Sequence, residues 1–562
     1  MMLIEEEAMK KDKTMKKNGF LTGAFIATFC IVLTKILGIV YVIPFHAIIG
    51  EQGGALYGYA YTIYLLFMSL SSAGIPLAIS KIVSEYQTLG YYNAKKRAFI
   101  IGKKIALLLG FVCFIILLLF APMIAQAVLG DLTGGNTIED VTFVIRIIGT
   151  AILVVPVLSI YRGYFEGHRF MQIPSFSQIV EQLVRVFIIV LGSFMALKVF
   201  KLSLTSAVGV AVFGATAGAI VAYLYLVFKK NKNKSKFNEK IRSVNEPIIT
   251  NKQIFKKIVI YAVPFIMIDI FKSLYSYIDM VTVVEGLVNY ANFSVVDAEV
   301  VMSMLSTWGA KFNMILLALS TGIVVSLIPN LTQSVVKKDQ ADSYHKINQS
   351  LSVLLFFTLP MSLGISFLSE YIWNVFYGSS VYGPSVLAYY IFVGLIVGLF
   401  TLVISILQVL KDYKTVFISL VVGVILKILL NSNLILAFYK MGLPAYYGVI
   451  TASLIGYFVS FVICIVQLRY KYKVRYEELV KNFMDILCGA MLMVVGLLVI
   501  KYLLPSSSNR FVSFLYVVIY TLIGGSIYFI YAYKSKLLFH VFGDKVRDLF
   551  RKKKSKSKRK RC

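Results

Sequence analysis

Apolar stretches of more than 20 residues alternate with short hydrophilic connections along most of the chain. Roughly 20 apolar residues are needed to cross a bilayer as a helix, so each stretch predicts one membrane span. Most stretches also contain Gly, Pro or polar residues, a texture typical of helices packed around a cavity. The pattern predicts an all-α integral membrane protein with 14 transmembrane helices, at residues 20–45, 57–85, 99–128, 141–164, 174–197, 204–228, 257–284, 304–333, 348–376, 386–410, 414–439, 445–469, 480–503 and 512–533.

The charges of the connections predict how the spans are oriented. Lys and Arg gather on the cytoplasmic side of membrane proteins. Here they concentrate in every second connection and at both ends of the chain, whereas the alternate connections hold acids such as Glu51, Asp131 and Glu139. We therefore expect a multi-pass protein of the cell membrane with both termini in the cytoplasm.

The longest hydrophilic break predicts the domain organisation, because it separates six spans from eight. Two short echoes support related halves: Ser72–Ile79 resembles Ser320–Leu327, and Arg185 in the fifth span has a counterpart in Lys427. Parallel repeats of this kind occur in transporters. The expected parts are a basic N-terminus (1–19), a first six-helix lobe (20–228), a cytoplasmic linker (229–256), a second lobe (257–469), two further helices (480–533) and a polybasic tail (534–562).

Composition agrees with a membrane protein that has basic cytoplasmic segments. The chain of 562 residues is 59% hydrophobic and carries a formal net charge of +30, whereas soluble domains hold roughly 45–50% apolar residues. We expect the polybasic tail to attract anionic lipids. Nucleic acid is not an expected partner, because no aromatic residue interleaves the charges of the terminal RKKKSKSKRKRC.

Five cations lie inside different predicted spans. Each charge at that depth costs on the order of 3 kcal/mol unless it faces protein or a water-filled cavity, so each marks a candidate functional site. An excess of cations in one cavity suits an anionic group such as phosphate or pyrophosphate. The candidate substrate-binding residues are Lys35, Arg185, Lys272, Lys311 and Lys427.

Three acids accompany these cations: Glu181, Asp269 and Asp279. Glu181 and Arg185 are spaced to pair on one helix face, which is compatible both with a structural ion pair and with a cavity wall. Asp269 and Asp279 lie on one stripe with Lys272, which suits either a structural pairing or the binding of a coupling Na⁺ or proton. Nearer the inner surface, Lys81 and Glu85 are spaced to pair with each other.

Several function classes lack their motifs in this sequence. No GxxxxGK[ST] loop for ATP occurs, no His, Cys and carboxylate cluster has the spacing of a metal site, and no G-x-S-x-G nucleophile motif is present. We expect a transporter powered by a gradient, not an enzyme, with no cofactor or metal beyond a coupling Na⁺ or H⁺.

Three segments carry a resemblance to a known family: AGIPLAISKIVSEY at 73–86, FSQIVEQLVRV at 176–186 and GAKFNMILLALSTGIVVSLIPNL at 309–331. Together with the 6+6+2 arrangement, they resemble the MOP exporter superfamily. Within it they are most similar to the Gram-positive MurJ-type lipid II flippases and the related stage V sporulation protein B. The similarity runs from about residue 18 to residue 535.

The resemblance implies two six-helix lobes that alternate between inward- and outward-open states, with the last two helices forming a groove for a lipid tail. It also implies essential cations in helices 1, 2 and 8. Lys35, in TKILG, matches a basic position of helix 1, and Lys311, in GAKF, lies where a helix 8 arginine is expected. The chain departs from the pattern at Tyr41, near a second helix 1 arginine, and in the middle of span 2, which has no cation.

The resulting hypothesis is a flippase that moves undecaprenyl-pyrophosphate-linked peptidoglycan precursor, lipid II, from the inner to the outer leaflet. The five cations would hold the pyrophosphate, and cell-wall synthesis proteins would be further partners. The alternatives are a flippase for another lipid-linked oligosaccharide, such as a capsule, teichuronic or exopolysaccharide unit, a MATE-type drug/cation antiporter, and a scaffold for cell-wall enzymes that does not transport. The basic cavity argues against the antiporter, because drug cations prefer acids and aromatics.

Overall fold

The computed structural model describes residue 30 and residues 33–233, 247–503 and 509–542. These residues are almost entirely helical, and none of them belongs to a β-strand. Twelve helices in this part of the chain are long and apolar enough to cross a membrane. Of the other two expected spans, 257–284 lies inside a long helix, and 20–45 lies partly outside the described residues. The expected all-α membrane class is thus confirmed.

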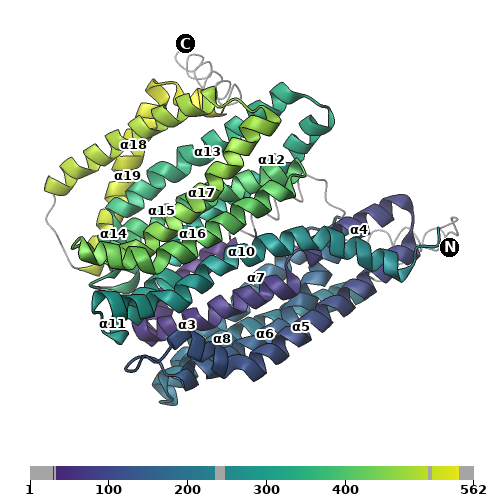
Figure 1. The fold of residues 1–562 in the computed structure, drawn as a ribbon, viewed down its shortest axis with the longest axis horizontal. Coiled ribbons are helices and arrows are strands. Elements are labelled where there is room, and N and C mark those ends of the chain that lie inside the picture. Colours follow the sequence, from purple (N-terminus) through teal and green to yellow (C-terminus); the bar gives the residue numbers. More distant parts are fainter. Residues whose placement is uncertain (1–29, 31–32, 234–246, 504–508, 543–562) are drawn as a thin grey trace, which may run out of the picture. The chain divides into compact units, whose positions relative to one another are not determined.

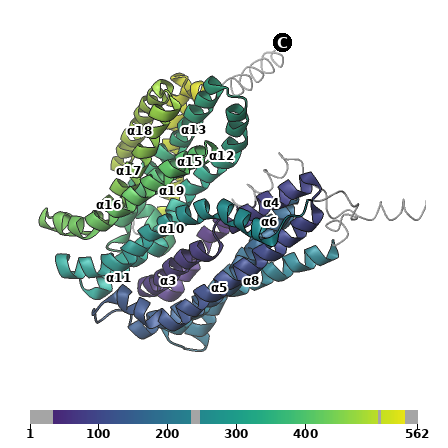
Figure 2. The same cartoon turned by 45° about the vertical axis from the view of Figure 1, so that its right-hand side comes forward.

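The chain divides into two compact units, the first ending at Glu285 and the second beginning at Gly286. In the first unit, α5, α6 and α8 lie side by side, and α6 also packs on α3 and α4 (Figures 1 and 2). The helices that begin in this unit are α3 (Val42–Ser72), α4 (Ile75–Leu89), α5 (Tyr92–Leu129), α6 (Ile138–Gly167), α7 (Gln172–Phe187), α8 (Leu204–Lys232) and α10 (Asn251–Ala291).

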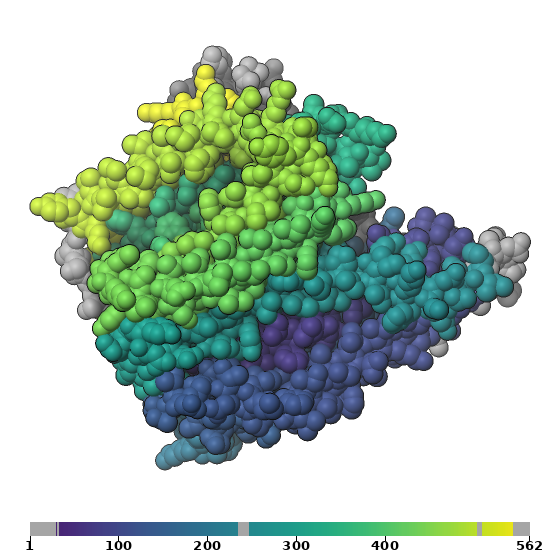
Figure 3. Space-filling model, in the orientation of Figure 1, coloured from purple at the N-terminus to yellow at the C-terminus, as the bar shows by residue number. Residues whose placement is uncertain are grey.

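The second unit has α16 packed on α17 and α12 packed on α15, with α13 against α18 and α18 against α19. Its surface is hollowed between α17 and α18 (Figure 3). The helices of this unit are α11 (Val295–Ser303), α12 (Ala310–Val336), α13 (Gln340–Phe367), α14 (Ser369–Tyr377), α15 (Gly383–Val409), α16 (Tyr413–Lys440), α17 (Tyr446–Tyr472), α18 (Glu477–Leu503), α19 (Arg510–Lys534) and α20 (Leu537–Phe542).

The division between the units lies later than the predicted start of the second lobe at residue 257. Residues 251–285 of α10 group with the first unit, although α10 continues as one helix to Ala291. Contacts with α3 and α4 account for this grouping: Ser273 Oγ lies 3.0 Å from Ser69 Oγ, and Lys257 Nζ lies 2.6 Å from Glu85 Oε1. The linker 229–256 and the tail 534–562 lie partly outside the described residues.

The second predicted span is interrupted. The chain bends at Ala73 and Gly74 between α3 and α4, and Gly74 has the left-handed backbone angle φ of 72°. Glycine suits this position for a second reason, because a Cβ there would lie 2.5 Å from the carbonyl oxygen of Ala262 on α10. Broken helices of this kind line the binding sites of many transporters, since they expose backbone groups inside the membrane.

Candidate functional site

The polar face of α7 holds an ion-pair cluster in the first unit. Glu181 accepts from two guanidinium groups: Arg185 Nη2 at 2.5 Å and Arg162 Nη2 at 2.7 Å. Arg185 also donates to the Tyr61 hydroxyl at 3.2 Å, and Arg162 donates to the Ser177 hydroxyl at 2.9 Å. The predicted pairing of Glu181 with Arg185 is therefore present, and it extends to α6 and α3.

The charged side chains of this cluster are largely shielded from the surroundings. The side chains of Arg162, Arg185 and Glu181 are 16%, 17% and 12% exposed, and Glu166, one turn after Arg162 on α6, also interacts electrostatically with Arg162. Arg185 Nε is buried and has no hydrogen-bond partner within the described residues. Arg185 can therefore donate a hydrogen bond to a further acceptor.

Close helix packing positions α7 for this role. A Cβ on Gly218 of α8 would lie 2.6 Å from the carbonyl oxygen of Glu181, so only glycine lets the two backbones approach this closely. Two π-helical segments, Ile188–Gly192 and Met195–Val199, follow α7 directly after Arg185. Such segments occur frequently at functional sites.

Lys35 lies on a helical segment, residues 33–40, next to this cluster. A Cβ on Gly38, one turn after Lys35, would lie 3.7 Å from Gln182 Nε2 of α7. The Lys35 side chain is partly exposed and has interactions with neighbouring residues. The structure thus brings the helix of Lys35 beside the helix of Glu181 and Arg185.

The charged stripe of α10 lies farther along the first unit. Asp269 and Lys272 are one turn apart and interact electrostatically, and the neighbouring Ser273 contacts α3. Asp269 is exposed, whereas Lys272 and Asp279 are partly exposed. Both acids and the lysine therefore remain accessible to a ligand or a coupling cation.

Lys311 occupies the start of α12 in the second unit. A third π-helical segment, Met304–Trp308, precedes it by three residues. Asn313, two residues later, donates to the carbonyl oxygen of Tyr390 at 3.3 Å, and Ser320 donates to that of Gly398 at 2.7 Å. These bonds hold α12 in register with α15, while the Lys311 side chain stays partly exposed.

Lys427 has a different environment from the other predicted cations. Its side chain is completely buried between α16 and α17. The ammonium group donates to Ser453 Oγ at 2.6 Å, Asn431 Oδ1 at 2.9 Å and the Val449 carbonyl oxygen at 3.1 Å. Three acceptors satisfy an ammonium group, so Lys427 holds two helices together and is not available to a ligand in this structure.

Three contacts were not expected from the sequence. Arg162, near the end of α6, was not expected to contact Glu181, because the two residues lie on different helices. Glu85 and Lys81 do not pair with each other: Glu85 pairs with Lys257, and Lys81 Nζ lies 3.9 Å from the ring centroid of Tyr261. All these partners are on other helices, and helix periodicity carries no signal for them.

An apolar cavity of about 250 Å³ lies between α13, α18 and α19 in the second unit. The side chains that line it are almost all aliphatic or aromatic, including Phe356, Met361, Met493, Leu497 and Tyr528. A hydrocarbon chain is the kind of ligand that such a lining accommodates. In the part of the chain that the structure describes, no group of three or more His, Cys, Asp or Glu residues could hold a metal ion.

Comparison with known proteins identifies relatives over nearly the whole chain. A family model described as polysaccharide biosynthesis protein matches residues 20–335. The chain is 32% identical over 542 residues to the lipid II flippase MurJ of Bacillus subtilis, covering 95% of this chain and 98% of the relative. It is 26% identical over 394 residues to stage V sporulation protein B of the same organism, covering 67% and 71%.

Solved structures show the same fold. A lipid II flippase MurJ in an inward closed conformation aligns with a TM-score of 0.62 at 17% identity, covering 94% of this chain and 100% of that one. An inward-facing multidrug resistance MATE family transporter of the MOP superfamily aligns with a TM-score of 0.59 at 10% identity, covering 78% and 95%. At these identities the likeness concerns the fold alone.

Proposed function

The chain belongs to the polysaccharide biosynthesis protein family, and from this premise we propose that it is a flippase for lipid II, the undecaprenyl-pyrophosphate-linked peptidoglycan precursor. It is a multi-pass membrane transporter rather than an enzyme. The observation that carries the proposal is the near full-length match to the Bacillus subtilis lipid II flippase, which leaves no large part of either chain unaccounted for.

The proposed contacts with the pyrophosphate come from four cations. Lys35, Arg185, Lys272 and Lys311 are partly exposed, and pyrophosphate accepts hydrogen bonds from both guanidinium and ammonium groups. Lys427 is left out, because its three acceptors already satisfy it. Arg162 is added as the second partner of Glu181, so that it shares the carboxylate with Arg185.

The acids of the site would balance charge between transport events. Glu181, which accepts from the guanidinium groups of both Arg162 and Arg185, would hold them between transport events. Asp269 and Asp279, on the accessible stripe of α10, would bind a coupling Na⁺ or proton. An inside-negative membrane potential also favours outward movement of an anionic headgroup, by about 2.3 kcal/mol per charge per 100 mV.

The apolar cavity between α13, α18 and α19 is the proposed site for part of the lipid tail. Its lining offers few polar groups, as an isoprenoid chain requires. We further propose that both termini lie in the cytoplasm, in line with the positive charges of alternate connections, and that rocking of two lobes gives alternating access.

A second candidate function is transport of another lipid-linked oligosaccharide. The family description names polysaccharide biosynthesis in general, and the pyrophosphate contacts would serve any undecaprenyl-pyrophosphate carrier. A drug/cation antiporter is supported only by the fold shared with MATE transporters.

The experiment depletes this protein in its own cell and locates lipid II with an externally added probe. We expect lipid II to disappear from the outer leaflet and accumulate inside. Wild type and Lys311→Arg, which keeps the charge, should restore the outer pool, whereas Lys311→Ala should not. Lys440→Ala, at an exposed lysine of the α16 C-terminus, is the matched control and should behave as wild type.

Unchanged outer lipid II would contradict the proposal unless a second flippase covers the loss, which deletion of any further flippase in the same cell decides. If lipid II stays in place in that strain while another surface glycan is lost, the cargo is the other glycolipid. Restoration by Lys311→Ala would remove this lysine from the substrate site and favour a scaffold.

A further inference from the structure

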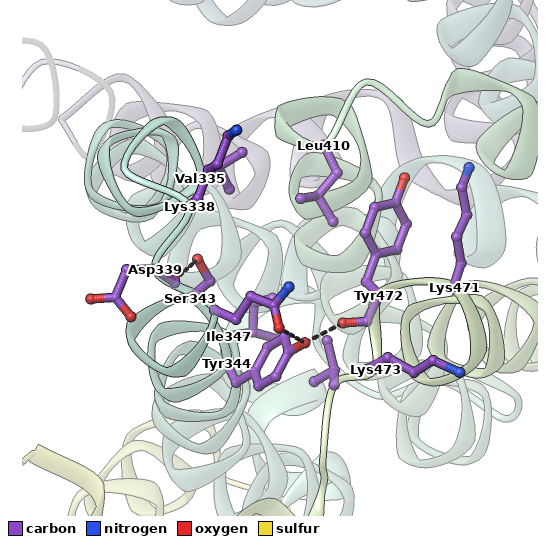
Figure 4. A pocket seen from close by; sticks show the side chains of 12 residues that line it. Val335, Lys338, Asp339, Ser343, Tyr344, Ile347, Leu410, Lys471, Tyr472 and Lys473 are labelled. Atoms are coloured by element: carbon purple, nitrogen blue, oxygen red, sulfur yellow. Dashed lines mark hydrogen bonds between the residues drawn. The ribbon is translucent and has the colours of Figure 1, made fainter.

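A second cavity, of about 340 Å³, opens in the second unit where three connections meet (Figure 4). It is lined by the turn between α12 and α13, by Leu410 at the end of α15, and by residues 471–474 between α17 and α18. None of these residues belongs to the substrate or lipid-tail sites described above. The cavity is therefore a separate feature of this unit.

The cavity has an apolar floor and a cationic rim. Ile347 and Val474 are buried at its base, whereas Lys338, Lys471 and Lys473 are exposed at its edge. Charged and apolar side chains are thus separated in this cavity, as charged headgroups and acyl chains are separated at a membrane surface.

Two of the three lysines have ammonium groups that are not engaged elsewhere. Lys471 Nζ donates to Asp412 Oδ2 at 2.8 Å, but Lys338 and Lys473 have no side-chain hydrogen bond or ion pair with the residues that the structure describes. The one carboxylate of the lining, Asp339, accepts from the backbone N–H of Asp342. In Figure 4 it lies on the same side of the cavity as Lys338 and opposite Lys471 and Lys473.

Hydrogen bonds hold the connection that carries Lys473 in place. The Tyr344 hydroxyl donates to the carbonyl oxygen of Tyr472 at 2.6 Å, as Figure 4 shows. Asn348 Nδ2 donates to that of Arg475 at 2.7 Å. Both donors come from α13, so Lys473 is fixed relative to the helix that forms the cavity wall. The cavity is preformed and does not need to be assembled by a ligand.

Lys338 and Lys473 belong to a set of lysines with left-handed backbone angles that also includes Lys201, Lys411 and Lys536. Lys338 and Lys473 have left-handed φ angles of 56° and 59°, a conformation that glycine adopts most readily at helix C-termini. A positive charge there also stabilises the end of the helix. Lys411, with φ of 59° after α15, shares that general role but does not line the cavity. A variant of Lys411 therefore changes helix capping without changing the cavity lining.

We propose that this cavity binds a phosphate group carried by an anionic ligand, with Lys338 and Lys473 as its two main contacts. The ligand is either the headgroup of an anionic phospholipid, whose glycerol and first methylene groups suit the apolar floor, or a soluble phosphate ester. The site is independent of the proposed transport function. None of the proposed substrate-binding residues lines this cavity.

The test titrates purified full-length protein with a short-chain phosphatidylglycerol that carries a fluorescent label, and then with glycerol 3-phosphate as competitor. The variants are Lys338→Gly/Lys473→Gly, which removes both charges and suits the left-handed backbone, Lys338→Arg/Lys473→Arg, which keeps them, and Lys411→Gly as the matched control. We expect a roughly tenfold to thirtyfold loss of affinity in the double glycine variant, and affinity as in wild type for the arginine variant and the control.

Displacement of the lipid by glycerol 3-phosphate at a concentration comparable to that of the lipid would support a soluble phosphate ester as the source, and a need for a large excess of glycerol 3-phosphate would support a phospholipid. Equal affinity of wild type and the double glycine variant for both probes would overturn the site. So would an equal loss in Lys411→Gly, because the effect would then reflect general surface charge. A melting temperature close to that of wild type shows that the double glycine variant is folded.

Discussion

Lys257 Nζ of α10 lies 2.6 Å from Glu85 Oε1 of α4, although 172 residues separate them along the chain. Lys257 also lies 4.9 Å from the ring centroid of Tyr86. This contact, with the close approach at Gly74, attaches the first part of α10 to the first unit. It links the segment after the predicted linker to the interrupted second span.

Reversing one charge of this pair places like charges side by side. We expect Lys257→Glu to lower the melting temperature of the purified protein, because the carboxylates of residues 85 and 257 would repel each other. The exchange Glu85→Lys/Lys257→Glu should recover part of the loss but not the contact with the Tyr86 ring. Equal melting temperatures of single and exchanged variants would show that the pair does not hold α10.

Substitution of Gly74 by alanine tests the break in the second span. Gly74→Ala introduces a Cβ 2.5 Å from the Ala262 carbonyl oxygen on a left-handed backbone, so it combines a clash with strain of about 1 kcal/mol. Gly90→Ala is the matched control, since Gly90 has φ of 76° but nothing within 4 Å of the added Cβ. Thermal unfolding should show a clearly larger loss for Gly74→Ala, and similar losses would exclude the close approach.

Glu181→Gln should strongly destabilise the first unit. It removes the only carboxylate that Arg185 pairs with among the described residues and one of the two acids near Arg162, and breaking a largely buried ion pair costs about 3 kcal/mol or more. Glu181→Asp keeps the charge, and Gln182→Ala changes the neighbouring position. The yield of folded protein after membrane extraction measures the effect. If all three variants fold equally well, the ion pairs do not contribute to stability.

Lys427 and Lys311 should give opposite results. Lys427→Met removes an ammonium group from three acceptors and leaves them unsatisfied, at about 1–3 kcal/mol, so the melting temperature should fall while the folded fraction still transports. Lys311→Ala should leave stability nearly unchanged and abolish transport. Transport and melting temperature, measured on the same preparations, distinguish a structural role from a role in substrate binding. A Lys427→Met variant that is folded but inactive would indicate that Lys427 also binds the substrate.

Asp412, between α15 and α16, predicts a loss of stability in acid. Burial acts to raise the pKa of its carboxyl group, but hydrogen bonds from Lys471 and Thr415 outweigh it and hold the pKa below the ordinary value of 3.8. A lowered pKa means that the stabilisation is present above about pH 4 and lost as the pH falls through the folded-state pKa.

The measurement compares melting temperatures of wild type and Asp412→Asn from neutral pH to below about pH 4. Wild type should be the more stable at neutral pH, and the difference between them should shrink on acidification. A difference that stays constant with pH would assign the contribution of Asp412 to packing rather than to charge.

Much of the architecture follows from the sequence, because hydrophobic length and charge alternation act locally. The stripe that places Glu181 and Arg185 on one face of α7 is likewise a property of a single helix. The partners of that stripe are not: Arg162 reaches it from α6, and nothing in helix periodicity specifies which helices meet. The same limit explains why Lys81 and Glu85 were expected to pair with each other.

Lys311 and Lys427 illustrate the limit most clearly. In the sequence each is a lysine in an apolar stretch, so the expected free-energy cost of burying the charge is the same for both. The structure separates them because Asn431, Val449 and Ser453 meet around one ammonium group. Two of those acceptors lie on the next helix, so the difference depends on the packing of α16 against α17.

The π-helical segment Met304–Trp308 has a consequence for how this part of the chain tolerates the loss of a residue. A π turn accommodates one residue more than an α turn, and each residue advances an α-helix by about 100°. Loss of a single residue within this segment would therefore rotate the approach to Lys311 by about that angle relative to α11, without changing any side chain. At this position the number of residues in the helix before Lys311 decides, as much as the lysine itself, in which direction the charge points.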